Sequence, residues 1–367
     1  MTMRLPKLPP PYQPFVVRDD FIVRADLFPL PGTYNGRLEE RHFELDDQYE
    51  RYLRERLASF TRSVEPYRCI DPADPVALAE VYSRLFAILG REHPDYIVVS
   101  GEVIELCLLG LKLDLADRQN VGVSLAPDAP GIGREVARWL DAQVGLARFG
   151  DALALACQED IVIMQIRDDG SHNAESLHVL LPSTWNPREK YQQSFARIHE
   201  PVAESSRLIA SSDNVMKAMV IKGPYVRFGL SLTTRPELDS HPDHCKPWNS
   251  AWLDDVDLLA STCIVRIERQ TTFPIPDLRR ALFTVRIYNT PLIELADSRP
   301  DLLPRLATIL RSASPAVLTY KGIDGYAGLI ASWCEYQSER LGSTNAYRSC
   351  PEGCPGSATS DSRRNSC

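Results

Sequence analysis

The spacing of apolar residues predicts helices in the first 150 residues of the chain. Apolar side chains recur at helical intervals in three segments, with charged residues between them. In the second segment Asp74 comes directly before Pro75, the usual order of an N-cap and a first helical residue. The expected helices are Leu45–Phe60, Asp74–Glu92 and Gly133–Leu146.

From Asp151 onward the pattern changes to short β-branched runs that are typical of strands. Two long runs, Ser261–Phe273 and Arg280–Leu292, flank the turn-rich segment PIPDLR and predict an antiparallel hairpin. Shorter strands are expected at the end of 151–166 and in 175–183, and helices in 187–198, 211–221, 300–312 and 325–341. Strands grouped in mid-chain with helices around them predict an α+β fold rather than a doubly wound sheet.

Composition divides the chain into three parts. Residues 1–44 are proline-rich and predict an irregular arm on the surface. Residues 45–338 predict a single domain, and residues 339–367 form a Ser-, Gly- and Cys-rich tail with too few large apolar residues to order itself.

Charge and hydropathy exclude two classes of partner. The net charge of −8 provides no basic surplus to replace the counterions of nucleic acid. No apolar run reaches the roughly 18 residues that a membrane helix needs. The opening MTMRLPKLPPPYQPF has proline where a signal peptide has its apolar core, and widely spaced cysteines are typical of a reducing compartment. We therefore expect a soluble cytoplasmic protein.

Polar residues alternate with apolar ones along both strands of the predicted hairpin. One face of the first strand carries Ile264, Arg266, Glu268 and Gln270 with Arg269 on the other face, and one face of the second carries Leu282, Thr284, Arg286 and Tyr288. A solvated sheet face has this pattern. So does a sheet that lines a pocket for an anionic ligand, since arginine binds carboxylates well. Periodicity leaves both interpretations open.

The segment WNPREKYQQSFARIHEPV places His199 just after a predicted helix, with Pro201 restricting the chain behind it. A histidine held in this way is suited to ligating a cofactor, and it is equally suited to capping a helix end through backbone groups. A second histidine, His178, lies on an apolar strand in SLHVLL.

Five segments resemble, in order and spacing, the α-subunit family of heme-dependent oxidative N-demethylases, whose characterised member is a dimethylamine monooxygenase subunit. The segments are CQEDIVIM, LPSTWNPREKYQQSFARIHEPV, RIERQT, LFTVRIYNTPL and LTYKGI, and the resemblance runs from about Asp46 to about Tyr336. It implies a PAS-like antiparallel sheet that holds heme b. It also implies O₂-dependent oxidation of a small amine, with electrons from NAD(P)H supplied by a separate flavin and iron–sulfur reductase.

The resemblance gives the histidines and arginines expected roles. His199 is then the expected axial ligand of the heme iron, with His178 as its rival. Arginine forks suit the heme propionates better than lysine. The arginine candidates are Arg227, Arg266, Arg269 and Arg286.

The resemblance also implies groups on the oxygen-binding side of the heme. Glu268 would hold a protonated amine there, and Tyr288 or Gln270 would polarise bound oxygen. The alternative for Glu268 is a cross-strand salt bridge with Arg286.

Three other interpretations account for parts of the sequence. A PAS-like heme protein that senses a gas without catalysis remains open, although no output domain is evident. His241, His244 and Cys245 form a metal-like cluster, but no second cluster completes a zinc site and a polar loop is favoured. Cys350 and Cys354 precede prolines in the tail, where adventitious thiols are favoured over a heme site.

Overall fold

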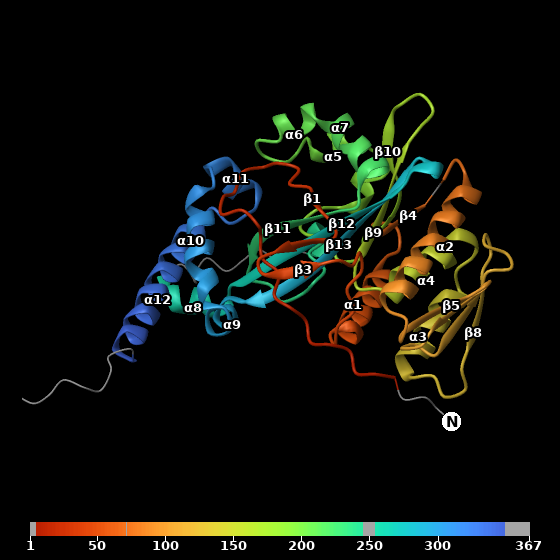
Figure 1. Cartoon of the computed structure of the whole chain (residues 1–367), viewed down its shortest axis with the longest axis horizontal. Helices are drawn as coiled ribbons and strands as arrows, with labels where there is room; N and C mark the ends of the chain where they lie inside the picture. The colour runs from red at the N-terminus through yellow and green to blue at the C-terminus, as the bar shows by residue number, and fades with distance from the viewer. Residues whose placement is uncertain (1–4, 71, 245–253, 349–367) are drawn as a thin grey trace, which may run out of the picture.

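The computed structural model describes residues 5–70, 72–244 and 254–348, with the backbone alone for 341–348 (Figure 1). Its main sheet is antiparallel, with the order β1-β11-β12-β13-β9-β10-β4. These strands are β1 Phe28–Pro29, β11 Tyr225–Thr233, β12 Ile264–Ile275, β13 Arg280–Pro291, β9 Asp160–Ile166, β10 His172–His178 and β4 Arg68–Ile70. The mixed helix-and-sheet fold with antiparallel strands is confirmed, as is the predicted hairpin, which is β12–β13.

The helices surround this sheet. They are α1 Tyr49–Arg62, α2 Pro75–Glu92, α3 Gly131–Asp141, α4 Gly145–Ala156, α5 Phe195–His199, α6 Ser206–Ala210, α7 Ser212–Lys217, α8 Val256–Thr262, α9 Leu292–Ser298, α10 Leu303–Ser312, α11 Pro315–Tyr320 and α12 Ala327–Arg348. The predicted cap of α2 is confirmed, because the Asp74 carboxylate accepts a hydrogen bond from the Ala77 backbone N at 2.9 Å. α12 runs past the predicted boundary at residue 338, and the rest of the predicted tail, 349–367, lies outside the described residues.

Two helical segments differ from the prediction. The helix expected over 133–146 ends at Asp141, and α4 begins at Gly145, whose φ of +59° favours glycine. The segment that opens 151–166 therefore belongs to a helix, and the strand begins only at Asp160. Of the helix expected over 187–198, Pro187–Lys190 is a 3₁₀ turn and α5 alone is α-helical.

A second sheet was missed from the sequence. It is antiparallel, with the strands β5 Ile97–Ser100, β6 Val103–Leu106, β7 Leu111–Asp114 and β8 Gly122–Leu125. Each strand has four residues, which is too short for alternation to identify. A ribbon of β2 Gly32–Tyr34 and β3 Arg37–Glu39 lies within the proline-rich segment.

The register of the hairpin defines two faces of the main sheet. Directly opposed residues of antiparallel strands share a face. Arg269 lies opposite Arg286 and Ile267 opposite Tyr288, so these four residues define what we name the closed face. Glu268 lies opposite Ile287 in β13 and Gly229 in β11, on the other side, which we name the open face. The alternative of a Glu268–Arg286 salt bridge is therefore wrong, because the two side chains leave the sheet in opposite directions.

The two faces are covered differently. Apolar residues of the closed face pack with α1, α2 and α4 in one cluster and with α8, α10 and α12 in another. On the open face, α7 and the π-helical turn Ala218–Lys222 cover the end formed by β9 and β10 (Figure 1). Along β11, residues of the closed face are buried whereas those of the open face are half-buried. Among the polar side chains of the open face, Arg227 and Glu268 are half-buried, whereas Arg266 and Gln270 are buried.

Candidate functional site

His199 ends the short helix α5. Ser194 caps this helix, accepting a hydrogen bond from the Arg197 backbone N at 3.3 Å. The Nδ1 atom of His199 lies 2.7 Å from the carbonyl O of Phe195, and the two rings stack with centroids 4.1 Å apart. A carbonyl only accepts hydrogen bonds, so Nδ1 carries the ring proton and Nε2 keeps its lone pair. This is the tautomer that a metal-binding histidine needs.

The surroundings of His199 keep its ring neutral. Burial lowers its pKa to about 4, and the cations Arg227 and Lys190 act in the same direction. The hydrogen bond to Phe195 opposes this shift without reversing it. At pH 7 the imidazole is therefore unprotonated, and Nε2 does not have to lose a proton before it binds a metal.

His178 occupies a different environment. It is buried in the core, with Nε2 3.3 Å from Oδ1 of Asp151. A Cβ placed on Gly150 would lie 2.3 Å from its Cε1 atom and 2.6 Å from Nε2, so α4 fills the space in front of the ring. The second carboxylate oxygen of Asp151 accepts hydrogen bonds from Arg68 at 2.6 Å and Trp139 at 2.9 Å. His178 thus belongs to a buried polar network that leaves no room for a porphyrin.

The open face carries a connected row of polar side chains. Gln270 donates from Nε2 to Oε2 of Glu268 at 2.7 Å, and Arg227 donates from Nη1 to Oε1 of Gln270 at 3.2 Å. Gly229 lies opposite Glu268, and a Cβ there would lie 3.9 Å from the Glu268 carboxylate, so the glycine leaves the space beside that carboxylate open. The Nε atom of Arg227 is buried without a hydrogen-bond partner in the described part of the chain.

Two residues that were given no role from the sequence complete this surface. Lys321, directly after α11, interacts electrostatically with Glu268, and Glu268 in turn helps to raise the pKa of Tyr320. Burial raises the pKa of Glu268, but Lys321, Ser183, Arg266 and Gln270 together hold it below the ordinary value, so the carboxylate is ionised. Burial also lowers the pKa of Lys321. The LTYKGI segment contributed to the family resemblance, but no spacing rule connects Lys321 to a strand 50 residues earlier.

The arginines of the two faces differ in their partners. On the closed face Arg269 pairs with Glu39 at 2.8 Å and Arg286 with Asp46 at 2.6 Å, and both are fully buried. On the open face Arg227 and Arg266 have no carboxylate within 4.0 Å among the described residues. Arg266 donates instead to the carbonyl of Leu238 at 2.9 Å and to Ser183 Oγ at 2.9 Å.

The predicted site residues therefore fall into two groups. Arg227, Arg266, Glu268 and Gln270 lie together on the open face. His199 ends α5, which packs with α7 in the apolar cluster that covers this face at β9 and β10. Arg269, Arg286 and Tyr288 lie on the closed face and are not in this site, because the sheet itself separates them from Glu268. Both closed-face arginines are already neutralised, and Tyr288 packs 5.0 Å from the Arg286 guanidinium.

Within the described residues, the histidine loop gives no complete metal site. The His241 Nδ1 atom accepts a hydrogen bond from the Asp243 backbone N at 3.2 Å, and the His241 and His244 rings lie 5.5 Å apart. Cys245 lies outside the described residues. Among the residues that are described, no group of three or more His, Cys, Asp or Glu side chains could hold a metal ion.

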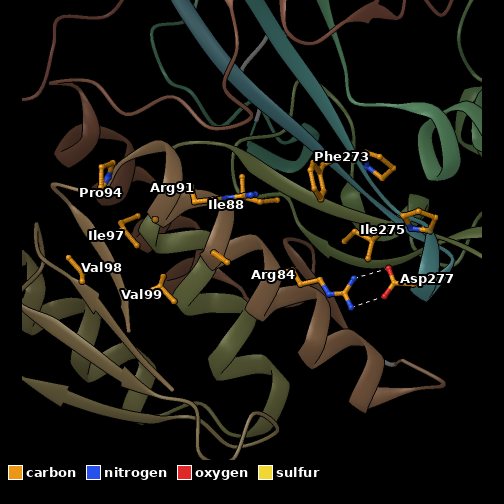
Figure 2. A pocket seen from close by; sticks show the side chains of 14 residues that line it. Arg84, Ile88, Arg91, Pro94, Ile97, Val98, Val99, Phe273, Ile275 and Asp277 are labelled. Carbon is orange, nitrogen blue, oxygen red and sulfur yellow. Dashed lines mark hydrogen bonds and ion pairs between the residues drawn. The ribbon is translucent and has the colours of Figure 1, made fainter. Parts of the chain in front are cut away.

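A surface cavity of about 770 Å³ lies away from this site, between α2, β5 and the end of β12 (Figure 2). Its walls are largely apolar, and Arg84 and Asp277 close one side with a hydrogen bond of 2.8 Å. None of the predicted site residues lines this cavity.

The fold and the site together define a protein with a neutral, oriented histidine and with cations that have no carboxylate partner among the described residues, which suits a metal-bearing anionic cofactor. Comparison with known families gives the more particular result. The model of the family described as "Haem-dependent oxidative N-demethylase, alpha subunit-like" matches residues 37–330, and the chain belongs to this family. No curated protein matched the chain. No helix in the described part is both long and apolar enough to cross a bilayer.

The family description supports three general statements about the chain. It is related to oxidative enzymes of the N-demethylase type, and a dependence on heme is supported. The words "alpha subunit" point to a partner subunit.

Proposed function

We propose that this chain binds heme b in a PAS-like sheet and uses O₂ to oxidise an amine, in the manner of an oxidative N-demethylase. Family membership supports the class of reaction. The observation that carries the proposal is the orientation of His199, whose Nδ1 is bound to the Phe195 carbonyl while Nε2 is left free to ligate iron.

The side chains of the open face fit such a cofactor. Arg227, Arg266 and Lys321 supply three positive charges that interact with the carboxylate of Glu268. Asp160 and Glu55 also act on Arg266, but Asp160 pairs with Arg56 and Glu55 with Arg51. Asp26, which also acts on Arg227, already accepts a hydrogen bond from Arg18 at 2.8 Å. The remaining positive charge suits the two propionates of heme. The Nε atom of Arg227, which has no hydrogen-bond partner within the described residues, is a donor available to one of them.

Glu268 would bind the substrate. Its depressed pKa keeps it ionised at pH 7, so it attracts a protonated amine, and the hydrogen bond from Gln270 fixes one of its oxygens. When bound, heme supplies the oxygen activation and the electron transfer that the oxidation of an amine requires. The role of the chain itself is to orient the amine and to keep it near the cofactor.

Electrons would come from a separate NAD(P)H reductase with flavin and iron–sulfur centres. The sequence supports this because it carries no dinucleotide fingerprint and no closely grouped cysteines in a folded region. Cys69, Cys157, Cys263 and Cys334 are free buried thiols, which supports a reducing compartment such as the cytoplasm.

The experiment is an optical titration of the purified full-length chain with hemin, followed by additions of dimethylamine and larger N-methyl amines. We expect a Soret band that shifts on reduction with dithionite and again with CO, and a further shift with an amine in wild type that is weakened in Glu268→Gln. A folded chain with no Soret band would overturn the heme proposal. A Soret band that responds to CO but to none of the amines would favour a gas-binding protein instead.

A further inference from the structure

One residue connects His199 to a second histidine that has no part in the site described above. The carbonyl O of Phe195 accepts from Nδ1 of His199 at 2.7 Å, and the backbone N of the same residue donates to Nδ1 of His172 at 3.2 Å. The Phe195 ring stacks on the His199 ring. Both hydrogen-bonding groups of Phe195 and its side chain are thus engaged with histidines.

The tautomer of His172 follows from this contact. The backbone N–H of Phe195 is a donor, so Nδ1 of His172 must accept and its proton must lie on Nε2. Nε2 lies 3.3 Å from the Asp213 carboxylate of α7, to which it donates. His172 begins β10, where it is buried, and Asp213 is largely exposed. The bond to Phe195 is therefore the better shielded of the two.

The helix that carries His199 is too short to hold its own position. α5 has five residues, and a helix of this length gains little from its own hydrogen bonds. Its position depends on contacts with the sheet and with α7, made by Phe195 and Ile198 in an apolar cluster with Met216. Within these contacts, the bond to His172 holds the peptide group between Ser194 and Phe195 at the start of α5. Because Phe195 is helical, the orientation of this group also limits that of the next peptide group, whose carbonyl orients the His199 ring.

We propose that His172 is a positioning residue for His199: through the backbone of Phe195 it sets the direction in which His199 Nε2 points. This inference rests on the proposed heme function, since a direction for Nε2 matters only if Nε2 binds iron. Groups that orient an iron-binding imidazole affect cofactor affinity as well as its electronic properties.

Two substitutions separate this role from a general role in folding. In His172→Asn, Oδ1 occupies nearly the place of Nδ1 and can accept from Phe195 N. In His172→Gln, the side-chain oxygen reaches instead the place of Nε2, so the acceptor for Phe195 is lost while a polar side chain of similar size is kept. Both variants would be produced as full-length protein, titrated with hemin and examined by absorption and electron paramagnetic resonance spectroscopy.

We expect His172→Asn to retain the wild-type spectrum and affinity. We expect His172→Gln to bind heme about 10- to 100-fold more weakly, with an altered signature of the axial imidazole. Equal affinity and spectra in Gln, Asn and wild type would overturn the inference. Absence of a Soret band in wild type would instead overturn the proposed function.

A measurement on the unaltered protein provides a second test. The ¹⁵N shifts of the histidine rings distinguish a nitrogen that carries a proton from one that accepts a hydrogen bond. We expect an unprotonated Nδ1 in His172 and a protonated Nδ1 in His199. A protonated Nδ1 in His172 would contradict the proposed contact, whatever the variants show.

Discussion

The two faces of the main sheet use the same residue type in opposite ways. On the closed face Arg286 is fully buried and pairs with Asp46 at 2.6 Å. On the open face Arg227 is half-buried, binds Gln270 and has no carboxylate within ion-pair distance among the described residues. A buried charge is costly unless it is paired, so the closed-face pairs maintain the fold. An arginine without a carboxylate partner can pair with a carboxylate of a bound ligand.

The largest expected effect is on the closed face. We expect Arg286→Ala to lower the free energy of unfolding by about 3–5 kcal/mol, because it leaves the Asp46 carboxylate buried without its partner. Urea denaturation followed by circular dichroism measures this change.

The matched control is Arg227→Ala on the open face, which removes the same side chain without leaving a buried carboxylate behind. We expect it to change the free energy of unfolding by less than about 1 kcal/mol. Equal changes in the free energy of unfolding for the two variants would contradict the proposed difference between the faces.

The next largest expected effect is on the affinity for the amine. We expect Glu268→Gln to weaken amine binding about 10- to 100-fold, because a charge-assisted hydrogen bond contributes about 1.5–3 kcal/mol. The heme content should not change, since His199 is untouched. Amine-induced changes in the Soret band report the affinity, and an unchanged affinity would mean that another group holds the ammonium.

Glu159, which lies behind the closed face, is expected to have a smaller effect on the pH dependence of the free energy of unfolding. Burial raises its pKa from 4.5 to about 7, although Arg286 and the backbone N of Glu44 act against this. The native state therefore keeps this proton up to about pH 7, whereas the unfolded chain loses it near pH 4.5. The stabilisation is complete at lower pH and is lost as the pH rises through this interval.

The substitution Glu159→Gln should abolish this loss of stability at higher pH, because glutamine does not ionise. We expect the variant to gain about 1–3 kcal/mol relative to wild type when the pH is raised from 5 to 8. Comparing the two proteins at each pH cancels the contributions of other groups, including His199, whose lowered pKa acts in the opposite direction. An identical pH dependence in both proteins would show that Glu159 is ionised throughout.

The smallest expected effect is that of pH on heme affinity. With its pKa lowered to about 4, His199 stays neutral from pH 8 to pH 5, so heme affinity should change by less than about twofold. A histidine of ordinary pKa would lose roughly thirtyfold at pH 5 to protonation of the ligand. Hemin titrations at the two pH values measure this, and a thirtyfold loss would mean that the ring is exposed.

The sequence predicted the hairpin because twelve-residue strands give enough alternation to recognise, and it predicted α2 from its cap and apolar spacing. It could not predict β5–β8, which are four residues each. It also could not divide the arginines between the faces. Alternation assigns a face within one strand, but only the register shows that Arg269 and Arg286 point together, away from Glu268.

The sequence pattern also could not predict the partners of the closed-face arginines. Glu39 and Asp46 lie more than 200 residues before the hairpin, in and next to the segment that was expected to form an irregular arm. Lys321 reaches the open face from the end of α11, where local pattern gives no sign of a site. His199 was found because it belongs to a segment that resembles a family, and its tautomer became evident only with the Phe195 contact.

We propose the open face, with His199, as the heme site. The most direct test is a hemin titration of wild type, His199→Ala and His178→Gln, with free imidazole added to each. We predict that His199→Ala alone loses the histidine-ligated Soret spectrum, that imidazole restores it, and that His178→Gln matches wild type. A wild-type spectrum in His199→Ala, with loss in His178→Gln, would contradict the account.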